Sequence, residues 1–356
     1  MAKSAAAATK VSVPLERLDP TLKSHAVQKF ENDLAAKIIG QPEAVSSFVG
    51  AYQIYVSGLH PTGRPVAVLL LAGPTGTGKT RVCEASAEIL LGSPQAVTKI
   101  NCAEYHLSHE TARLIGPPPG FVGFRETQPA LSQENIDHFQ TDRCKLSFVL
   151  FDEIEKANET LWQLLLGILD KGQLTLGDSR KTDFSLSIIA MTSNLGAREV
   201  DRLMTGASIG FTKPEIKGNI IASTVDAQIK KRFTPEFVNR IDRTVVFNRL
   251  EREHYERILQ LELDLIQGRV FLASSTKDAP VFALRWLPSV RNLLLDRGTD
   301  TKYGARELKR VIERDIVLPL SNLVSSNSIT EGDIIVVGVE KGNISFHRET
   351  TRAPSE

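Results

Sequence analysis

The sequence has no long hydrophobic run, few cysteines and almost no excess of charge of either sign. None of its apolar stretches approaches the roughly 20 residues of a membrane-spanning helix, and residues 1–10 are too short and weakly apolar for a signal-peptide core. Cys83, Cys102 and Cys144 are widely spaced, so neither a disulfide framework nor a cysteine metal motif is expected. These absences favour a reducing cytoplasm and no membrane partner.

The charge balance also limits the partners. The 43 basic and 42 acidic residues give a formal net charge of +1, which removes the electrostatic argument for broad nucleic-acid binding. His106 and His109 lie near Cys102, but their spacing matches no common ligand pattern, so we expect no metal site there. The 356 residues, 42% of them hydrophobic, are typical of a globular protein with two domains.

Three short apolar runs predict strands that are buried on both faces of a parallel sheet, at residues 66–72, 148–151 and 186–191. Helical segments separate these runs. The alternation predicts an α/β fold in which a parallel-sheet αβα large domain covers residues 23–247, after a flexible leader at 1–22. Ligand chemistry is then expected at the carboxyl ends of the strands.

After residue 247 the pattern changes to amphipathic helical segments, at 251–270, 287–297 and 304–324. Short strands are predicted near 281–284, 333–339 and 343–347, the last two joined by a tight turn at Lys341-Gly342-Asn343. We therefore expect a smaller, mainly helical C-terminal domain at 248–349, followed by a tail at 350–356.

A glycine-rich segment between the first strand and a helix has the form of a P-loop: Gly73, Pro74, Thr75, Gly76, Thr77, Gly78, Lys79 and Thr80. In such a loop the backbone N–H groups surround phosphates, and the following helix directs its positive end at them. Lys79 would reach the β- and γ-phosphate oxygens, and the Thr80 hydroxyl would bind Mg²⁺. ATP and Mg²⁺ are the expected cofactors.

Two adjacent carboxylates, Asp152 and Glu153, end the second predicted strand. Asp152 is expected to hold the metal, and Glu153 to orient and deprotonate a water that attacks the γ-phosphate. Paired acids after a strand are common by themselves, so the interpretation depends on the P-loop upstream.

Five further motifs accompany these two. They are Ile39-Gly40-Gln41, Gly116-Pro117-Pro118-Pro119-Gly120-Phe121-Val122-Gly123, Met191-Thr192-Ser193-Asn194, FTPEFVNRID at 233–242, and Tyr303-Gly304-Ala305-Arg306. With them the chain resembles the second ATPase module of the Clp-type AAA+ chaperones, over about residues 30–339. The family's amino-terminal domain and first ATPase module are not in this sequence, which leaves disaggregation and substrate choice open.

The resemblance implies a homo-hexameric ring that binds ATP between subunits. By match to the family motifs, Arg240 would be a trans-acting arginine finger and Asn194 a sensor that positions the attacking water. Arg306 would be a second sensor that reaches from the small domain to the phosphates of ATP. A salt bridge within one chain is the alternative for Arg240, with Arg243 close by, and a strand-end cap is the alternative for Asn194. Ile38 and Ile39 would contact adenine, or belong simply to the core.

The resemblance also implies that Phe121 and Val122 belong to a pore loop that grips a threaded polypeptide, with Phe121 in place of the usual tyrosine. Packing of this aromatic into the core is the alternative. Ile209-Gly210-Phe211 is similar to the tripeptide by which some Clp unfoldases dock on a ClpP-like peptidase; a local apolar turn explains it as well.

We therefore expect an ATP-dependent protein unfoldase. The rival functions are a nucleotide-regulated AAA+ assembly or scaffold protein, and a nucleic-acid-remodelling motor, which the neutral charge disfavours.

Overall fold

The computed structural model describes residues 17–117, 129–197, 199–200, 218–276, 280–300 and 303–349. Its main sheet has five parallel strands in the order β2-β3-β6-β1-β7. The strands are β1 (Ala67–Ala72), β2 (Thr98–Asn101), β3 (Ser147–Asp152), β6 (Ser187–Ser193) and β7 (Arg243–Val246). The structure confirms the predicted α/β fold class.

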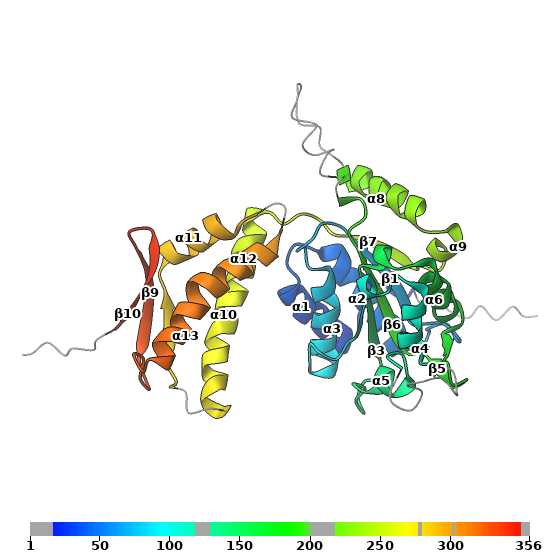
Figure 1. The fold of residues 1–356 in the computed structure, drawn as a ribbon, viewed down its shortest axis with the longest axis horizontal. Helices are drawn as coiled ribbons and strands as arrows, with labels where there is room; N and C mark the ends of the chain where they lie inside the picture. Colours follow the sequence, from blue (N-terminus) through cyan, green and yellow to red (C-terminus); the bar gives the residue numbers. More distant parts are fainter. Residues whose placement is uncertain are drawn as a thin grey trace, which may run out of the picture.

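The central strands are buried on both faces, because helices cover each side of the sheet (Figure 1). Alternate side chains point to opposite faces of a strand. In β1, Leu69 and Leu71 pack with α1 (His25–Lys37), α2 (Pro42–Ser57) and α3 (Lys79–Leu91). Val68 and Leu70 pack with α6 (Glu159–Lys171), α8 (Gly218–Arg232) and α9 (Pro235–Val238).

Short elements complete the large domain. They are 3-10 turns η1 (Cys102–Glu104), η2 (Ser108–Thr111) and η3 (Ile154–Lys156), helices α4 (Ala112–Ile115) and α5 (Gln133–Asp137), and the antiparallel pair β4 (Gln173–Thr175) and β5 (Lys181–Asp183). The three cysteines are unpaired and buried.

The small domain has its own hydrophobic core. Its helices are α10 (Arg252–Thr276), α11 (Pro288–Gly298), α12 (Ala305–Ile312) and α13 (Leu318–Ser325), with the π-helical turn η4 (Glu313–Val317) between the last two. A sheet in the order β10-β9-β8 flanks them, made of β8 (Ala283–Trp286), β9 (Ile334–Glu340) and β10 (Asn343–Arg348). No described helix is long and apolar enough to cross a membrane.

Several details differ from the sequence-based expectations. The strands β2 and β7 were not predicted, because each contains polar residues and only one buried residue, Ile100 or Val245, and neither has an apolar run of four residues. The segment 304–324 was expected to be one helix, but it contains η4. The reason is Pro319, which has no N–H to donate to the carbonyl one turn back and therefore disturbs the α-helical ladder.

Candidate functional site

The glycine-rich segment 73–78 connects β1 to α3 at the carboxyl end of the sheet. The backbone at Gly76 has a φ of 75° and approaches the small domain so closely that a Cβ atom there would lie 2.2 Å from the Tyr303 carbonyl oxygen. Glycine is therefore required at this position by both conformation and space. The first turn of α3, with Lys79 and Thr80, presents its N-terminal end to the loop.

The Lys79 ammonium group is buried beneath this loop. It donates to the carbonyl oxygens of Gly73 (2.8 Å) and Pro74 (2.7 Å) and to Oδ1 of Asn194 (2.9 Å). Burial lowers the pKa of Lys79 to about 8; the charge of Glu155 opposes this shift, while that of Arg306 adds to it. Among the described residues, the hydrogen-bond acceptors of this cation are neutral oxygens in a confined space, so the cation is ready to be paired with an anion such as a phosphate.

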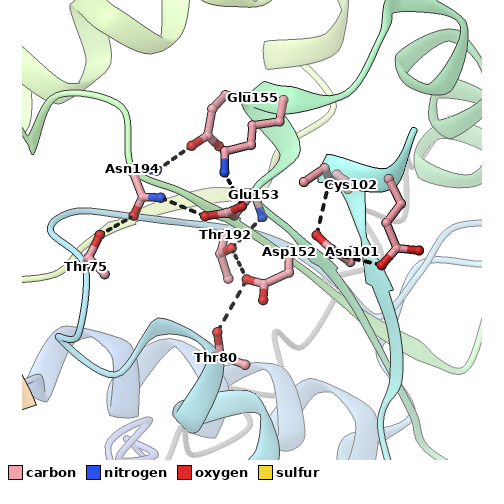
Figure 2. A network of polar contacts seen from close by, with 12 residues as sticks. Thr75, Thr80, Asn101, Cys102, Asp152, Glu153, Glu155, Thr192 and Asn194 are labelled. Atoms are coloured by element: carbon pink, nitrogen blue, oxygen red, sulfur yellow. Dashed lines mark hydrogen bonds and ion pairs between the residues drawn. The ribbon is translucent and has the colours of Figure 1, made fainter. Parts of the chain in front are cut away.

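The two carboxylates lie where β3 ends, opposite the first turn of α3 (Figure 2). Oδ1 of Asp152 accepts hydrogen bonds from the hydroxyls of Thr192 (2.5 Å) and Thr80 (3.4 Å). The Thr192 hydroxyl also accepts from the Glu153 backbone N–H (2.9 Å). Thr192 therefore aligns both acids, a contact that the sequence did not predict although it places this residue near the end of an apolar strand.

Asn194, which follows β6, joins the two halves of the site (Figure 2). Its Oδ1 accepts from Lys79 and, at 3.4 Å, from the Thr75 hydroxyl, while its Nδ2 donates to Oε1 of Glu153 at 3.4 Å. The other carboxylate oxygen of Glu153 forms an ion pair with Lys156 at 2.5 Å. The amide thus bridges the P-loop lysine and the second carboxylate.

A cavity of about 570 Å³ opens beside these groups, lined by residues of both domains. Its walls include Ile38 and Ile39. Both residues are also buried hydrophobic residues, each 6% exposed, so the structure is compatible with adenine contact and with a core position. Arg306, at the start of α12, lines the same cavity together with Lys79. Apolar walls beside a basic, glycine-rich rim suit a molecule with a flat base and a phosphate chain.

The small domain and the segment that connects it to the large domain each form hydrogen bonds with the P-loop. The Ala305 N–H donates to the Gly76 carbonyl oxygen at 3.1 Å. Gln41 is only 2% exposed; its Nε2 donates to the carbonyl oxygens of Thr77 (3.3 Å) and Asn248 (2.9 Å), and its Oε1 accepts from the Asn248 N–H (2.9 Å). Gln41 belongs to the Ile39-Gly40-Gln41 motif, but the sequence gives no sign of this bridge.

Arg240 lies apart from this cavity. Its Nε is 3.3 Å from Oδ1 of Asp170, an ion pair without hydrogen-bond geometry at that nitrogen. Arg243 is directed elsewhere and donates to the Ser47 hydroxyl at 3.3 Å. Among the described residues, the cavity lining includes neither arginine. Phe121, Val122 and the tripeptide Ile209-Gly210-Phe211 lie outside the described residues.

The oxygen atoms near Asp152 are of the kind that binds a divalent cation. The Thr80 hydroxyl and the Asp152 carboxylate present oxygen atoms to one spot, which is the ligand type that Mg²⁺ prefers. The Lys99 ammonium is 3.5 Å from Oδ2 of Asp152 and leaves Oδ1 directed to Thr80 and Thr192. The residues therefore fit Mg²⁺ beside a phosphate.

The fold and site together define a P-loop nucleoside triphosphatase: a parallel sheet, a phosphate loop, a strand-end carboxylate pair and a polar residue between them. Comparison with known families and structures agrees. The AAA domain (Cdc48 subfamily) profile matches residues 64–244, and the C-terminal D2-small domain profile of ClpB matches residues 250–337.

The chain is 34% identical to the chaperone protein ClpB of Rhodopirellula baltica over 329 residues, 92% of this chain and 35% of that protein. It is 33% identical to ClpC/MecB of Bacillus subtilis, named a negative regulator of genetic competence, over 93% of this chain and 39% of that one. A closed-state structure of Hsp104 with ATPγS and casein superimposes with a TM-score of 0.74 at 27% identity, over 90% of this chain and 51% of that one.

The chain therefore belongs to the Clp/Hsp100 family of AAA+ ATPases and corresponds to its second ATPase module with the attached small domain. This confirms the resemblance inferred from the motifs. The chain spans about a third of the length of the curated relatives that it matches.

Proposed function

We propose that this chain is the motor module of an ATP-driven protein-remodelling machine, which hydrolyses ATP between the subunits of a homo-hexameric ring and moves polypeptide through the central pore. The observation that carries the proposal is the Asn194 amide, which connects Lys79 of the phosphate loop to the Glu153 carboxylate. This arrangement joins phosphate binding to a base that can activate water.

In this proposal the phosphates of ATP replace the loop carbonyls and the Asn194 oxygen as partners of the Lys79 ammonium. Asn194 is then free to hold the attacking water beside Glu153, whose carboxylate takes a proton as the water oxygen bonds to the γ-phosphorus and ADP leaves. When bound, Mg²⁺ supplies positive charge next to the phosphate oxygens, and Thr80 and Asp152 would hold it.

Arg240 is proposed to act on the nucleotide of the adjacent subunit. It lies away from the cavity of its own chain, and its partner there, Asp170, is about as exposed as Arg240 itself, at 39% and 37% for the side chains. An exposed ion pair contributes little to stability, about 0–1 kcal/mol. Exchange of Asp170 for a neighbour's γ-phosphate is therefore energetically accessible and would make hydrolysis depend on ring assembly.

The proposed pore loop begins beside a second surface loop. The Gly177 N–H, in the connection between β4 and β5, donates to the Ile115 carbonyl oxygen at 2.8 Å, just before residues 118–128. Residues 170–180 resemble a second pore loop of the same family. This proximity supports a shared role for them and for the segment with Phe121 and Val122. That Hsp104 has been solved with ATPγS and casein supports a polypeptide as the substrate.

The test compares wild type with Glu153→Gln for ATPase rate, ring assembly by light scattering with ATP, and unfolding of a tagged fluorescent protein. We expect the variant to assemble with ATP yet lose both activities, because glutamine cannot accept the proton. Phe121→Ala should keep its basal ATPase and lose unfolding. A wild type that forms rings and hydrolyses ATP but unfolds no substrate, alone or with candidate adaptors, would favour a nucleotide-regulated scaffold.

We also propose that Ile209-Gly210-Phe211 docks on a ClpP-like peptidase. The support is the sequence similarity alone. Co-sedimentation of ATP-assembled rings with a bacterial ClpP, using a Phe211→Ala control, tests this part separately from threading.

A further inference from the structure

The backbone at Glu153 is in the left-handed region, with a φ of 58°, which a glutamate adopts only when its surroundings impose it. The turn that follows is held through three successive carbonyl oxygens. That of Glu153 accepts from the Lys156 N–H at 2.9 Å, and that of Ile154 from the Trp162 indole N–H at 3.1 Å. The Glu155 carbonyl accepts twice from the Arg232 guanidinium, at 3.1 and 2.6 Å.

The last two donors come from separate helices and contact one another. Trp162 is on α6 and Arg232 is the last residue of α8, and the guanidinium carbon lies 4.5 Å from the centre of the Trp162 ring. Trp162 also packs edge-on against Phe233, with ring centres 5.0 Å apart. Arg232 is therefore stacked on a ring that is fixed in the core, with both donors directed at a single carbonyl.

We propose that Arg232 and Trp162 are positioning residues for the catalytic turn: together they hold the backbone of residues 153–155 so that the Glu153 carboxylate meets the attacking water. The proposal rests on the proposed role of Glu153 in ATP hydrolysis. Neither residue lines the nucleotide cavity as the described chain forms it, so their effect is on chemistry and not on nucleotide binding.

The same turn also sets the position of Asn194. Oε1 of Glu155 accepts from the Asn194 backbone N–H at 3.1 Å, and the Asn194 side chain donates to Glu153 (Figure 2). The Glu155 backbone that Arg232 holds therefore carries the carboxylate that anchors Asn194. A shift of this turn therefore moves the proposed base and the proposed water-positioning amide together. A displacement of even 1 Å of such catalytic groups costs about 100-fold in rate.

Arg232 is suited to mutation because it is exposed and is not itself a member of the hydrophobic core. The test measures kcat and KM for ATP, and the Kd for a fluorescent nucleotide, in Arg232→Gln, Arg232→Lys and Trp162→Phe. Trp162→Phe keeps an aromatic side chain but lacks the indole N–H that donates to the Ile154 carbonyl oxygen. Lys231→Gln is the matched control, since Lys231 is the exposed neighbour on α8 and loses the same charge.

We expect Arg232→Gln to lower kcat about tenfold with Kd and KM changed less than twofold, since misplacing a general base costs one or more powers of ten. Arg232→Lys should recover part of the loss, because an ammonium donates to the carbonyl but lacks the two-pronged geometry. Trp162→Phe should lower kcat in the same direction, and Lys231→Gln should match wild type.

Two results would overturn the inference. One is a wild-type kcat in Arg232→Gln, and the other is a fall in kcat matched by an equal loss of nucleotide affinity or by a fall in Lys231→Gln. A wild-type chain that does not hydrolyse ATP under assembling conditions would instead refute the proposed function, so the two failures are distinguishable.

Discussion

Gln41 is the residue at which a conservative substitution should have the most informative effect on stability. Its buried side-chain amide forms three hydrogen bonds that link the P-loop, through Thr77, to the connection between the domains, through Asn248. In Gln41→Met the side chain keeps its length and apolar packing but can neither donate nor accept. The substitution therefore isolates the hydrogen bonds from the packing.

The expected magnitude follows from the three lost bonds. A hydrogen bond contributes about 0.5–1.5 kcal/mol net, and a buried group left without a partner costs about 1–3 kcal/mol. The bond to Thr77 is buried, whereas Asn248 is exposed enough for water to replace part of its loss. We expect the free energy of unfolding of the large domain to fall by about 2–3 kcal/mol, roughly 30- to 150-fold in the folding equilibrium.

The chain has a convenient reporter for this measurement, since it contains two tryptophans, one in each domain: Trp162 and Trp286. In a Trp286→Phe background, urea denaturation followed by fluorescence reports on the large domain alone, which avoids treating two domains as one transition. Gln28→Met is the control, because Gln28 is exposed and its described side-chain hydrogen bond is a single one, to the Lys23 carbonyl. A loss below about 0.5 kcal/mol for Gln41→Met would refute the reasoning.

Two further predictions concern nucleotide binding. At Gly304 (φ 59°) a Cβ atom would lie 2.8 Å from the Gly76 carbonyl oxygen, so Gly304→Ala should weaken fluorescent-nucleotide binding about tenfold. Gly332→Ala is the control for backbone strain, because Gly332 also has a positive φ (83°) but a Cβ atom there would meet no atom within 4 Å. This control variant should bind nucleotide normally. Because burial lowers the pKa of Lys79 to about 8 and bound phosphates raise it again, binding takes up a proton above that pH. The affinity for nucleotide should be constant below pH 7.5 and fall toward pH 9.5, by up to tenfold per pH unit. The Lys79→Arg variant, whose side chain is always charged, should lose this pH dependence even if it binds nucleotide more weakly. A flat wild-type profile would contradict the proton linkage.

Much of the fold was predictable because it is encoded in local patterns. Apolar runs of strand length marked β1, β3 and β6, the P-loop spacing marked residues 73–80, and the acids at the end of β3 marked Asp152 and Glu153. These signals depend on side-chain size, backbone freedom and nearby charge, which a short segment carries by itself. The exposed edge strand β2 carries no such signal and was not predicted.

What only the tertiary structure decided is which distant residues meet. The strand order places β6 between β3 and β1, so Asn194 emerges between Lys79, 115 positions earlier, and Glu153. Likewise, the hydrogen bonds between Gln41 and Asn248 join residues 207 positions apart, and those from Arg232 to the Glu155 carbonyl oxygen join residues 77 positions apart. Such contacts depend on strand order, register and helix packing, which arise from the whole core at once. The amino-acid sequence by itself therefore determined the kind of chemistry, and the packing of the folded chain determined which side chains hold it in place.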